Sequence, residues 1–80
     1  MTHAQTLVKA LNMLAKAPQF SHSKARAAAR TDGNVNWART KDHNDGFNPE
    51  VDGCESFVMN DGSLAAWQPA SYTYVARASA

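Results

Sequence analysis

Residues 55–76 read ESFVMNDGSLAAWQPASYTYVA, and this stretch decides the fold. Its β-branched and aromatic residues fall in three short runs, which are separated by the clusters Asn60-Asp61-Gly62 and Gln68-Pro69-Ala70-Ser71. Runs of this kind between Asn, Asp, Gly, Pro and Ser are typical of β-strands joined by tight turns. The stretch therefore predicts an antiparallel meander of three strands over residues 55–77.

The first turn decides which side chains share a face of the sheet. A three-residue turn at Asn60-Asp61-Gly62 and a two-residue turn at Asp61-Gly62 differ by one step, and that step regroups the faces. We expect the three-residue turn, followed by a four-residue turn at residues 68–71. One face then carries Phe57, Met59, Ala65, Trp67, Tyr72 and Tyr74, and the other carries Val58, Leu64, Ala66, Thr73 and Val75.

Two helices are predicted before the strands. In residues 2–17 the apolar residues recur at the i, i+3, i+4, i+7 spacing of one helical face, which leaves Asn12 on the opposite, solvated side. Thr2 and Gln5 have the spacing of a capping box, and Pro18 ends the helix. Residues 21–31 predict a second, Ala-rich helix, with a hairpin over residues 25–38 as the alternative.

The fold class that follows is α+β, with two N-terminal helices and then a small antiparallel meander. The meander has three strands, or four if residues 34–39 add one. Eighty residues make a single domain (1–80), with helices at about 2–17 and 21–31, an acidic loop at 41–54 and the meander at 55–77.

The net charge of +1 hides a separation of charges along the chain. Residues 1–41 hold seven Lys and Arg against one acid, Asp32, whereas residues 42–76 hold six acids and no Lys or Arg. If the halves stay apart in space, each presents a field of one sign that steers charged partners. If they pack together, the charges pair as ordinary surface salt bridges.

Cysteine usage and hydropathy indicate where the chain resides. The lone Cys54 excludes an internal disulfide and suits a reducing cytosol, so we expect a cytoplasmic protein. No stretch is long and apolar enough for a membrane span, and Lys9 interrupts what would be the apolar run of a secretory signal. The basic first 31 residues also fit a transit peptide, but their removal would strip the domain of its best helix.

No catalytic or metal-binding motif stands out. An EF-hand loop needs Gly at position 6 and Glu at position 12, but counting from Asp42 these positions hold Phe47 and Gly53. The potential zinc ligands Cys54, His3, His22 and His43 are widely spaced and form no paired motif. The acids around Cys54 would raise the pKa of a nucleophilic thiol served by His43. We therefore expect no enzymatic activity, no metal and no cofactor.

Nucleic-acid binding is supported by a basic cluster with one aromatic residue in it. Cations neutralise phosphates and an aromatic ring stacks on bases. Against this function, the pI of about 7.9 is below that of strongly basic nucleic-acid binders. The predicted contact residues are Lys24, Arg26, Arg30, Trp37, Arg39 and Lys41.

Protein binding is the function expected first, because one amphipathic helix covers only one face of the sheet. If Leu7, Leu11 and Leu14 pack on the aliphatic face, the aromatic face stays exposed as a contact surface or homodimer seam. In the alternative register the aromatic residues are simply the core. The acidic residues would occupy a basic groove of the partner that is built for nucleic acid. The predicted contacts are Asp42, Asp45, Glu50, Asp52, Glu55, Trp67, Tyr72 and Tyr74.

In size and charge layout the chain is similar to phage-encoded anti-defence proteins such as anti-CRISPRs, although no residue motif carries over a site from them. We therefore expect a non-enzymatic binding module that blocks or modulates a larger protein or ribonucleoprotein complex. The alternative is a small nucleic-acid-binding protein that uses the basic residues of the first half.

Overall fold

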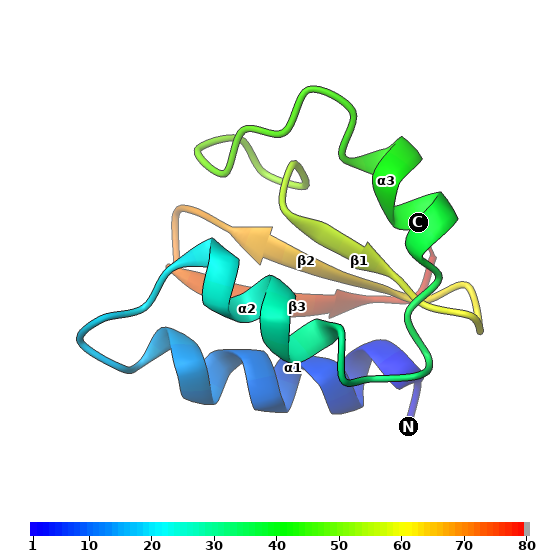
Figure 1. The fold of residues 1–80 in the computed structure, drawn as a ribbon, viewed down its shortest axis with the longest axis horizontal. Helices are drawn as coiled ribbons and strands as arrows, with labels where there is room; N and C mark the ends of the chain where they lie inside the picture. The colour runs from blue at the N-terminus through cyan, green and yellow to red at the C-terminus, as the bar shows by residue number, and fades with distance from the viewer. Residues whose placement is uncertain (80) are drawn as a thin grey trace.

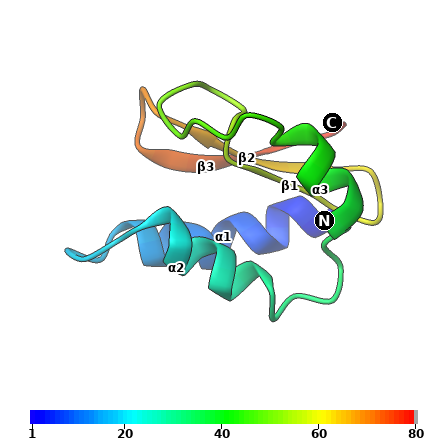
Figure 2. The same cartoon turned by 45° about the horizontal axis from the view of Figure 1, so that its top comes forward.

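The computed structural model describes residues 1–79, and within them the chain forms three helices followed by a three-stranded antiparallel sheet (Figure 1). The helices are α1 (His3–Ala15), α2 (His22–Ala29) and α3 (Trp37–His43), and the strands are β1 (Ser56–Val58), β2 (Leu64–Gln68) and β3 (Thr73–Arg77), in the order β1-β2-β3. α1 and α2 form a layer against the sheet, and α3 lies beside β1 (Figure 2). The predicted α+β class and the order of helices before the meander are confirmed.

α1 begins at the capping box that the sequence predicts, and a side-chain cap also starts α2. The Thr2 hydroxyl accepts a hydrogen bond from the Gln5 N–H at 3.1 Å, and the Thr2 N–H donates to the Gln5 side chain at 2.8 Å. The Ser21 hydroxyl accepts from the Lys24 N–H at 3.2 Å at the start of α2. These bonds satisfy N–H groups that have no partner inside a helix. The alternative hairpin over residues 25–38 is wrong.

The possible fourth strand over residues 34–39 is also wrong, because residues 37–39 belong to α3. The Asn36 side chain accepts from the Arg39 N–H at 3.1 Å and starts the helix at Trp37. Before the helix, the chain meets the meander in an isolated bridge between Val35 and Met59, where the Asn36 N–H donates to the Val58 carbonyl at 2.8 Å and the Asn60 N–H donates to the Asn34 carbonyl at 2.7 Å. The alternation of Val35 and Trp37 resembles a strand, but a capping Asn followed by helix-forming residues prevails.

The first hairpin has the expected three-residue turn. The Met59 N–H donates to the Ser63 carbonyl at 2.9 Å, and Phe57 lies opposite Ala65. Gly62 has a φ of +85°, a backbone conformation that glycine adopts without steric cost. Phe57, Met59, Ala65 and Trp67 therefore share one face, as predicted.

The second turn is displaced by one residue from the prediction. Gln68 pairs with Thr73 and Trp67 with Tyr74, so the turn spans residues 69–72. Tyr72 is therefore not a strand residue on the aromatic face: it closes the turn with a φ of +54° and is 59% exposed. Tyr74 stays on the predicted face. A shift of the turn by one residue moves the partner of each β2 residue by two positions along β3, so the alternation of side chains between the faces is preserved.

The aromatic face is the main core, so the expectation that it stays exposed is wrong. Trp67 and Tyr74 are 2% and 1% exposed, and they share a buried cluster with residues of α1 and α2. α2 contributes only Ala25 and Ala29 as fully buried residues, and these small side chains leave volume for the large rings. The opposite face holds a small aliphatic cluster of buried residues, Val58, Leu64 and Ala66, with Val75 packed against it.

Side chains of the helices hydrogen-bond to both outer edges of the sheet. At β3, the Asn12 amide donates to the Tyr74 carbonyl at 2.9 Å and accepts from the Tyr74 N–H at 2.7 Å. At β1, the Asn44 amide donates to the Ser56 carbonyl at 2.8 Å and accepts from its N–H at 3.2 Å. Each amide thus reproduces the hydrogen bonds of a neighbouring strand. Asn12 is a bridge to the sheet and does not lie on the solvated side.

The first hairpin turn also caps the start of α1. The Asp61 carboxylate accepts from the His3 N–H at 2.9 Å, and the Ser63 hydroxyl accepts from the Ala4 N–H at 3.1 Å. The bond from the His3 N–H, with those that Asp61 accepts from the hydroxyl and the N–H of Ser63, lowers the pKa of Asp61 from 3.8 to about 2. A sequence-distant carboxylate therefore completes the N-terminus of the first helix.

We predict that Asn12→Ala lowers the free energy of unfolding by about 2–3 kcal/mol, because it leaves the N–H and C=O of Tyr74 without partners at a covered edge. The control is Met13→Ala on the same helix, whose side chain is 76% exposed and which should change stability by less than about 0.5 kcal/mol. Urea unfolding measures both values. Equal losses for the two variants would show that the Asn12 amide does not stabilise the edge.

We predict that Asp61 makes stability depend on pH below about pH 4. A carboxyl whose pKa is lowered on folding stabilises the fold above its unfolded pKa, and this contribution disappears as the pH falls toward the folded pKa of about 2. The deficit of Asp61→Asn relative to the wild type should be constant near neutral pH and shrink between about pH 4 and pH 2. Asp45→Asn, at an exposed position, is the control. A deficit that does not change over this range contradicts the assignment.

Candidate functional site

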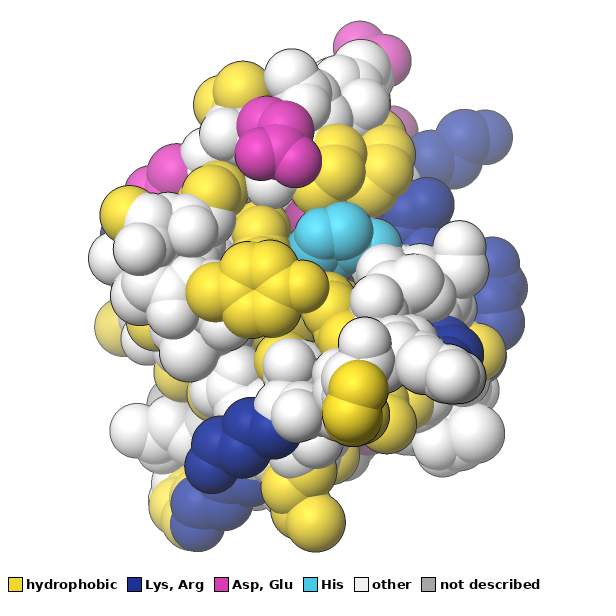
Figure 3. Space-filling view, turned by 90° about the vertical axis from the view of Figure 1, so that its left-hand side faces the viewer, with side chains coloured by type: hydrophobic (Ala, Val, Ile, Leu, Met, Phe, Trp, Pro, Cys, Tyr) yellow, Lys and Arg dark blue, Asp and Glu magenta, His cyan; other side chains and the backbone are white. Residues whose placement is uncertain are grey.

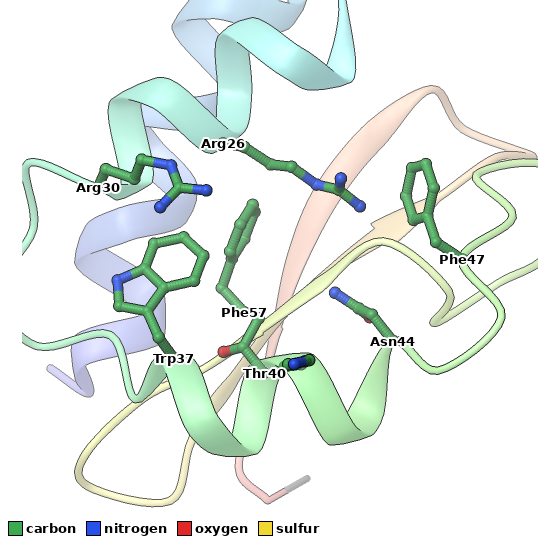
Figure 4. Close-up of a pocket in the computed structure, with 8 residues that line it drawn as sticks. Arg26, Arg30, Trp37, Thr40, Asn44, Phe47 and Phe57 are labelled. Carbon is green, nitrogen blue, oxygen red and sulfur yellow. The ribbon is translucent and has the colours of Figure 1, made fainter.

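A pocket of about 400 Å³ opens between α2, α3 and the segment that follows α3 (Figure 4). Phe57 of β1, which is 1% exposed, lines its inner side. The residues that line it are Arg26, Arg30, Trp37, Thr40, Lys41, Asn44, Phe47 and Phe57. Four of the six residues predicted for nucleic-acid contact are therefore brought together here.

Helical spacing explains why these side chains converge. Arg26 lies on α2, and Arg30, four residues later, is the C-cap residue of that helix. Trp37 and Lys41 are four residues apart on α3, so each pair lies on one side of its helix. In Figure 4 the side chains of Arg26 and Arg30 enter the pocket from one side, and the side chains of α3 enter it from the opposite side. The pocket therefore has a basic wall on α2 and a mixed aromatic and basic wall on α3.

The edge contacts of β1 hold α3 in this position. The Thr40 hydroxyl accepts from the Val58 N–H at 2.9 Å, and the Asn44 amide makes its two bonds to Ser56. Because the polar atoms of Thr40 and Asn44 are engaged with the strand, recognition of a ligand falls to the cations and the ring faces. Sequence reasoning missed Thr40, Asn44 and Phe47; reading residues 37–44 with helical spacing would have grouped the first two with Trp37.

Arg26 is fixed by an ion pair with Glu55. Its guanidinium donates to the Glu55 carboxylate at 2.8 Å and 3.2 Å, and the Glu55 side chain is fully buried. The same guanidinium lies over the Phe47 ring, 3.9 Å from its centre. Arg26 therefore anchors the acidic segment, which is the part of the predicted acidic loop that follows α3 (residues 44–54), to α2.

Glu55 does not belong to an exposed acidic surface, contrary to prediction. It pairs with β2, since its carbonyl accepts from the Trp67 N–H at 2.7 Å, and the alternation of the strand directs it to the face of Phe57. Burial raises the pKa of Glu55, and its bonds to Arg26 partly oppose this rise. The carboxylate is thus a buried group whose ionised form is stabilised by one partner, Arg26.

Arg30 and Lys41 supply the uncompensated charge of the pocket. The Arg30 guanidinium lies 5.0 Å from the centre of the half-buried Trp37 ring. Within residues 1–79, neither Arg30 nor Lys41 forms an ion pair with a carboxylate. The lining side chains include no carboxylate, imidazole or thiol, so the arrangement is suited to holding an anionic group beside a flat apolar one.

The other predicted basic residues lie outside the pocket. Lys24 is exposed and donates to the Gln19 carbonyl at 2.8 Å. Arg39 lines a separate hollow of about 330 Å³ with Asp42, His43 and Val58. The basic and acidic halves of the sequence partly neutralise each other in the fold, because Arg26 of the basic half pairs with Glu55 of the acidic half.

The residues predicted for contact with a protein are divided by the structure. Trp67, Tyr74 and Glu55 are buried and unavailable to a partner in this conformation. Asp42, Asp45, Glu50, Asp52 and Tyr72 are exposed. Asp52 lies 3.2 Å from Arg77 in an exposed ion pair, which stabilises the fold little.

In the part of the chain that the structure describes, no group of three His, Cys, Asp or Glu side chains is arranged to hold a metal ion. Cys54 is a partly buried free thiol. Among the helices of residues 1–79, none has the length and apolarity to cross a membrane. No family model, no curated protein and no solved structure matches this chain.

We predict that Arg26→Met destabilises the fold in a pH-dependent way. At about pH 7 it leaves a buried carboxylate unpaired, which should cost about 3 kcal/mol, near the lower end for a buried pair because Arg26 is 36% exposed. Removal of the guanidinium raises the Glu55 pKa further, so the folded variant binds a proton more tightly than its unfolded chain does. Its stability should therefore rise as the pH falls through that pKa, and the deficit should shrink.

Urea unfolding at about pH 7 and about pH 5 measures this effect. Arg30→Met is the matched control on the next turn of α2; it makes no ion pair within residues 1–79 and should cost less than about 1 kcal/mol at either pH. An Arg26→Met deficit that is the same at both values would contradict the buried, charge-dependent role of Glu55.

Proposed function

We propose that the chain is a non-enzymatic binding module that engages single-stranded nucleic acid through the pocket between α2 and α3. The observation that carries this proposal is the placement of Arg30 over Trp37, with Lys41 one helical turn further along α3. A phosphate would lie between the two unpaired cations while a base stacks on the half-exposed indole.

The charge around the pocket favours a single strand over a duplex. Base stacking on an aromatic side chain requires unpaired bases. The segment that supplies Asn44 and Phe47 also carries the exposed Asp45 and Glu50, which would repel the second strand of a duplex. With only two unpaired cations in the pocket, we expect modest affinity and a shallow dependence on salt.

We predict that Trp37→Ala and Lys41→Ala weaken binding of a labelled oligonucleotide of about 12 unpaired thymidines, a length within the usual site sizes of single-strand binders. Loss of one stacked base should reduce affinity by about 5- to 150-fold. Loss of one phosphate contact should reduce the slope of log affinity against log salt by about 0.7. Fluorescence anisotropy over a series of salt concentrations measures both quantities.

Arg39→Ala is the matched control, because it removes one cation from the same helix but outside the pocket. It should change affinity less than Lys41→Ala does. Absence of any binding at low salt, or equal effects of Arg39→Ala and Lys41→Ala, would refute the proposal.

We also propose a second candidate function, in which the chain binds a protein or a ribonucleoprotein complex and blocks it, as an anti-CRISPR-like phage inhibitor would. The observation in its favour is that Asp42, Asp45, Glu50 and Asp52 are exposed within one short segment. Carboxylates presented in this way complement a basic groove. A cytoplasmic location suits either function, because Cys54 is a free thiol.

A further inference from the structure

Four aromatic side chains gather at the end of the molecule where three connections meet. We define the aromatic end face as Phe20, His22, Phe47 and Tyr72, which come from the α1–α2 connection, the start of α2, the acidic segment and the β2–β3 turn. Figure 3 shows a histidine at the centre of this face with hydrophobic side chains on either side. The face lies over the buried Trp67, whose ring contacts Phe20, His22 and Tyr72.

Tyr72 is the most exposed of these rings, and its backbone is strained. A φ of +54° is a left-handed conformation that non-glycine residues rarely adopt, and the side chain remains 59% exposed. The ring meets Trp67 edge to face, with ring centres 4.9 Å apart, and Phe20 at 6.1 Å. A strained residue that presents a large ring to solvent indicates a contact role, because burial of that ring within the monomer does not account for it.

Charges of both signs border the aromatic end face: the acidic segment contributes carboxylates on one side, and the exposed Lys24 lies on the α2 side, where it donates to the Gln19 carbonyl. Burial and then Arg26 lower the pKa of His22, and the nearby Glu50 carboxylate partly opposes this shift. Figure 3 shows an acidic side chain on the same face, above and to the left of the histidine, with a hydrophobic side chain between them. Within the described residues, Asp45 and Glu50 form no ion pair, and the nearby Arg26 is already held by Glu55. The aromatic surface thus has an acidic rim on the side of the acidic segment.

We infer that the aromatic end face docks a protein segment in which Lys or Arg residues flank an apolar residue. The apolar residue would pack against Tyr72, and the basic residues would pair with Glu50 and Asp45. The acidic rim disfavours nucleic acid, since these carboxylates would repel phosphates. This inference rests on the second proposed function and names both its contact surface and the chemistry of its partner.

The test uses a set of labelled peptides that carry Lys or Arg around a central Leu, Phe or Pro, each with a counterpart in which Glu replaces the basic residues. Anisotropy should show preferential binding of basic peptides. Tyr72→Gly should reduce that affinity about tenfold or more, as truncation of an aromatic anchor does. Glycine adopts the left-handed backbone conformation without steric cost, so this variant should keep the fold. An unchanged thermal midpoint of unfolding would show that any loss of affinity comes from the missing ring and not from misfolding.

Glu50→Gln should weaken the same peptides and flatten their salt dependence, whereas Met13→Ala on exposed α1 surface should change nothing. If basic peptides bind but Tyr72→Gly has no effect, the inference fails while the second proposed function stands. If no basic peptide is preferred over its Glu counterpart, both fail. Concentration-dependent association of the protein in sedimentation, lost in Tyr72→Gly, would overturn the inference by showing that the occupant is a second copy.

Discussion

The structure depends on how a sheet of only three strands satisfies its two outer edges. Unpaired backbone groups at an edge either face water, recruit another chain or find side-chain partners. Here Asn12 serves β3, and Thr40 and Asn44 serve β1. The same bonds that complete the edges also fix α1 and α3 against the sheet. The position of α3, and with it the pocket, follows from completing the hydrogen bonds of β1.

The ion pair between Arg26 and the buried Glu55 connects the sheet and its helices to the binding surfaces. Glu55 enters the core because of its place in the strand alternation, and Arg26 compensates its charge while lying over Phe47. The acidic segment is therefore tied to α2 at one ring, with the basic pocket on one side and the aromatic end face on the other. Phe47 lines the first and belongs to the second, so the basic wall of the pocket and the carboxylates of the acidic segment lie on adjacent surfaces.

Local signals in the sequence predicted much of the fold and part of the site. Capping residues located α1 and α2, and Gly62 marked the first turn without deciding between its two-residue and three-residue forms. The basic set was also recognised, although Lys24 and Arg39 lie outside the pocket. Residues 34–39 were misassigned because Val35 and Trp37 alternate like a strand, while the Asn36 cap that starts a helix there was overlooked.

By itself, the sequence determined that helices precede the meander, the capped ends of two helices and the alternation of the strands, because these depend on neighbours a few residues apart. Only the tertiary structure decided which sheet face is buried. That choice depends on volume, since the small Ala25 and Ala29 admit the rings of Trp67 and Tyr74. The burial of Glu55 and the convergence of Arg30, Trp37 and Lys41 likewise required contacts between segments distant in the chain, which local patterns do not encode.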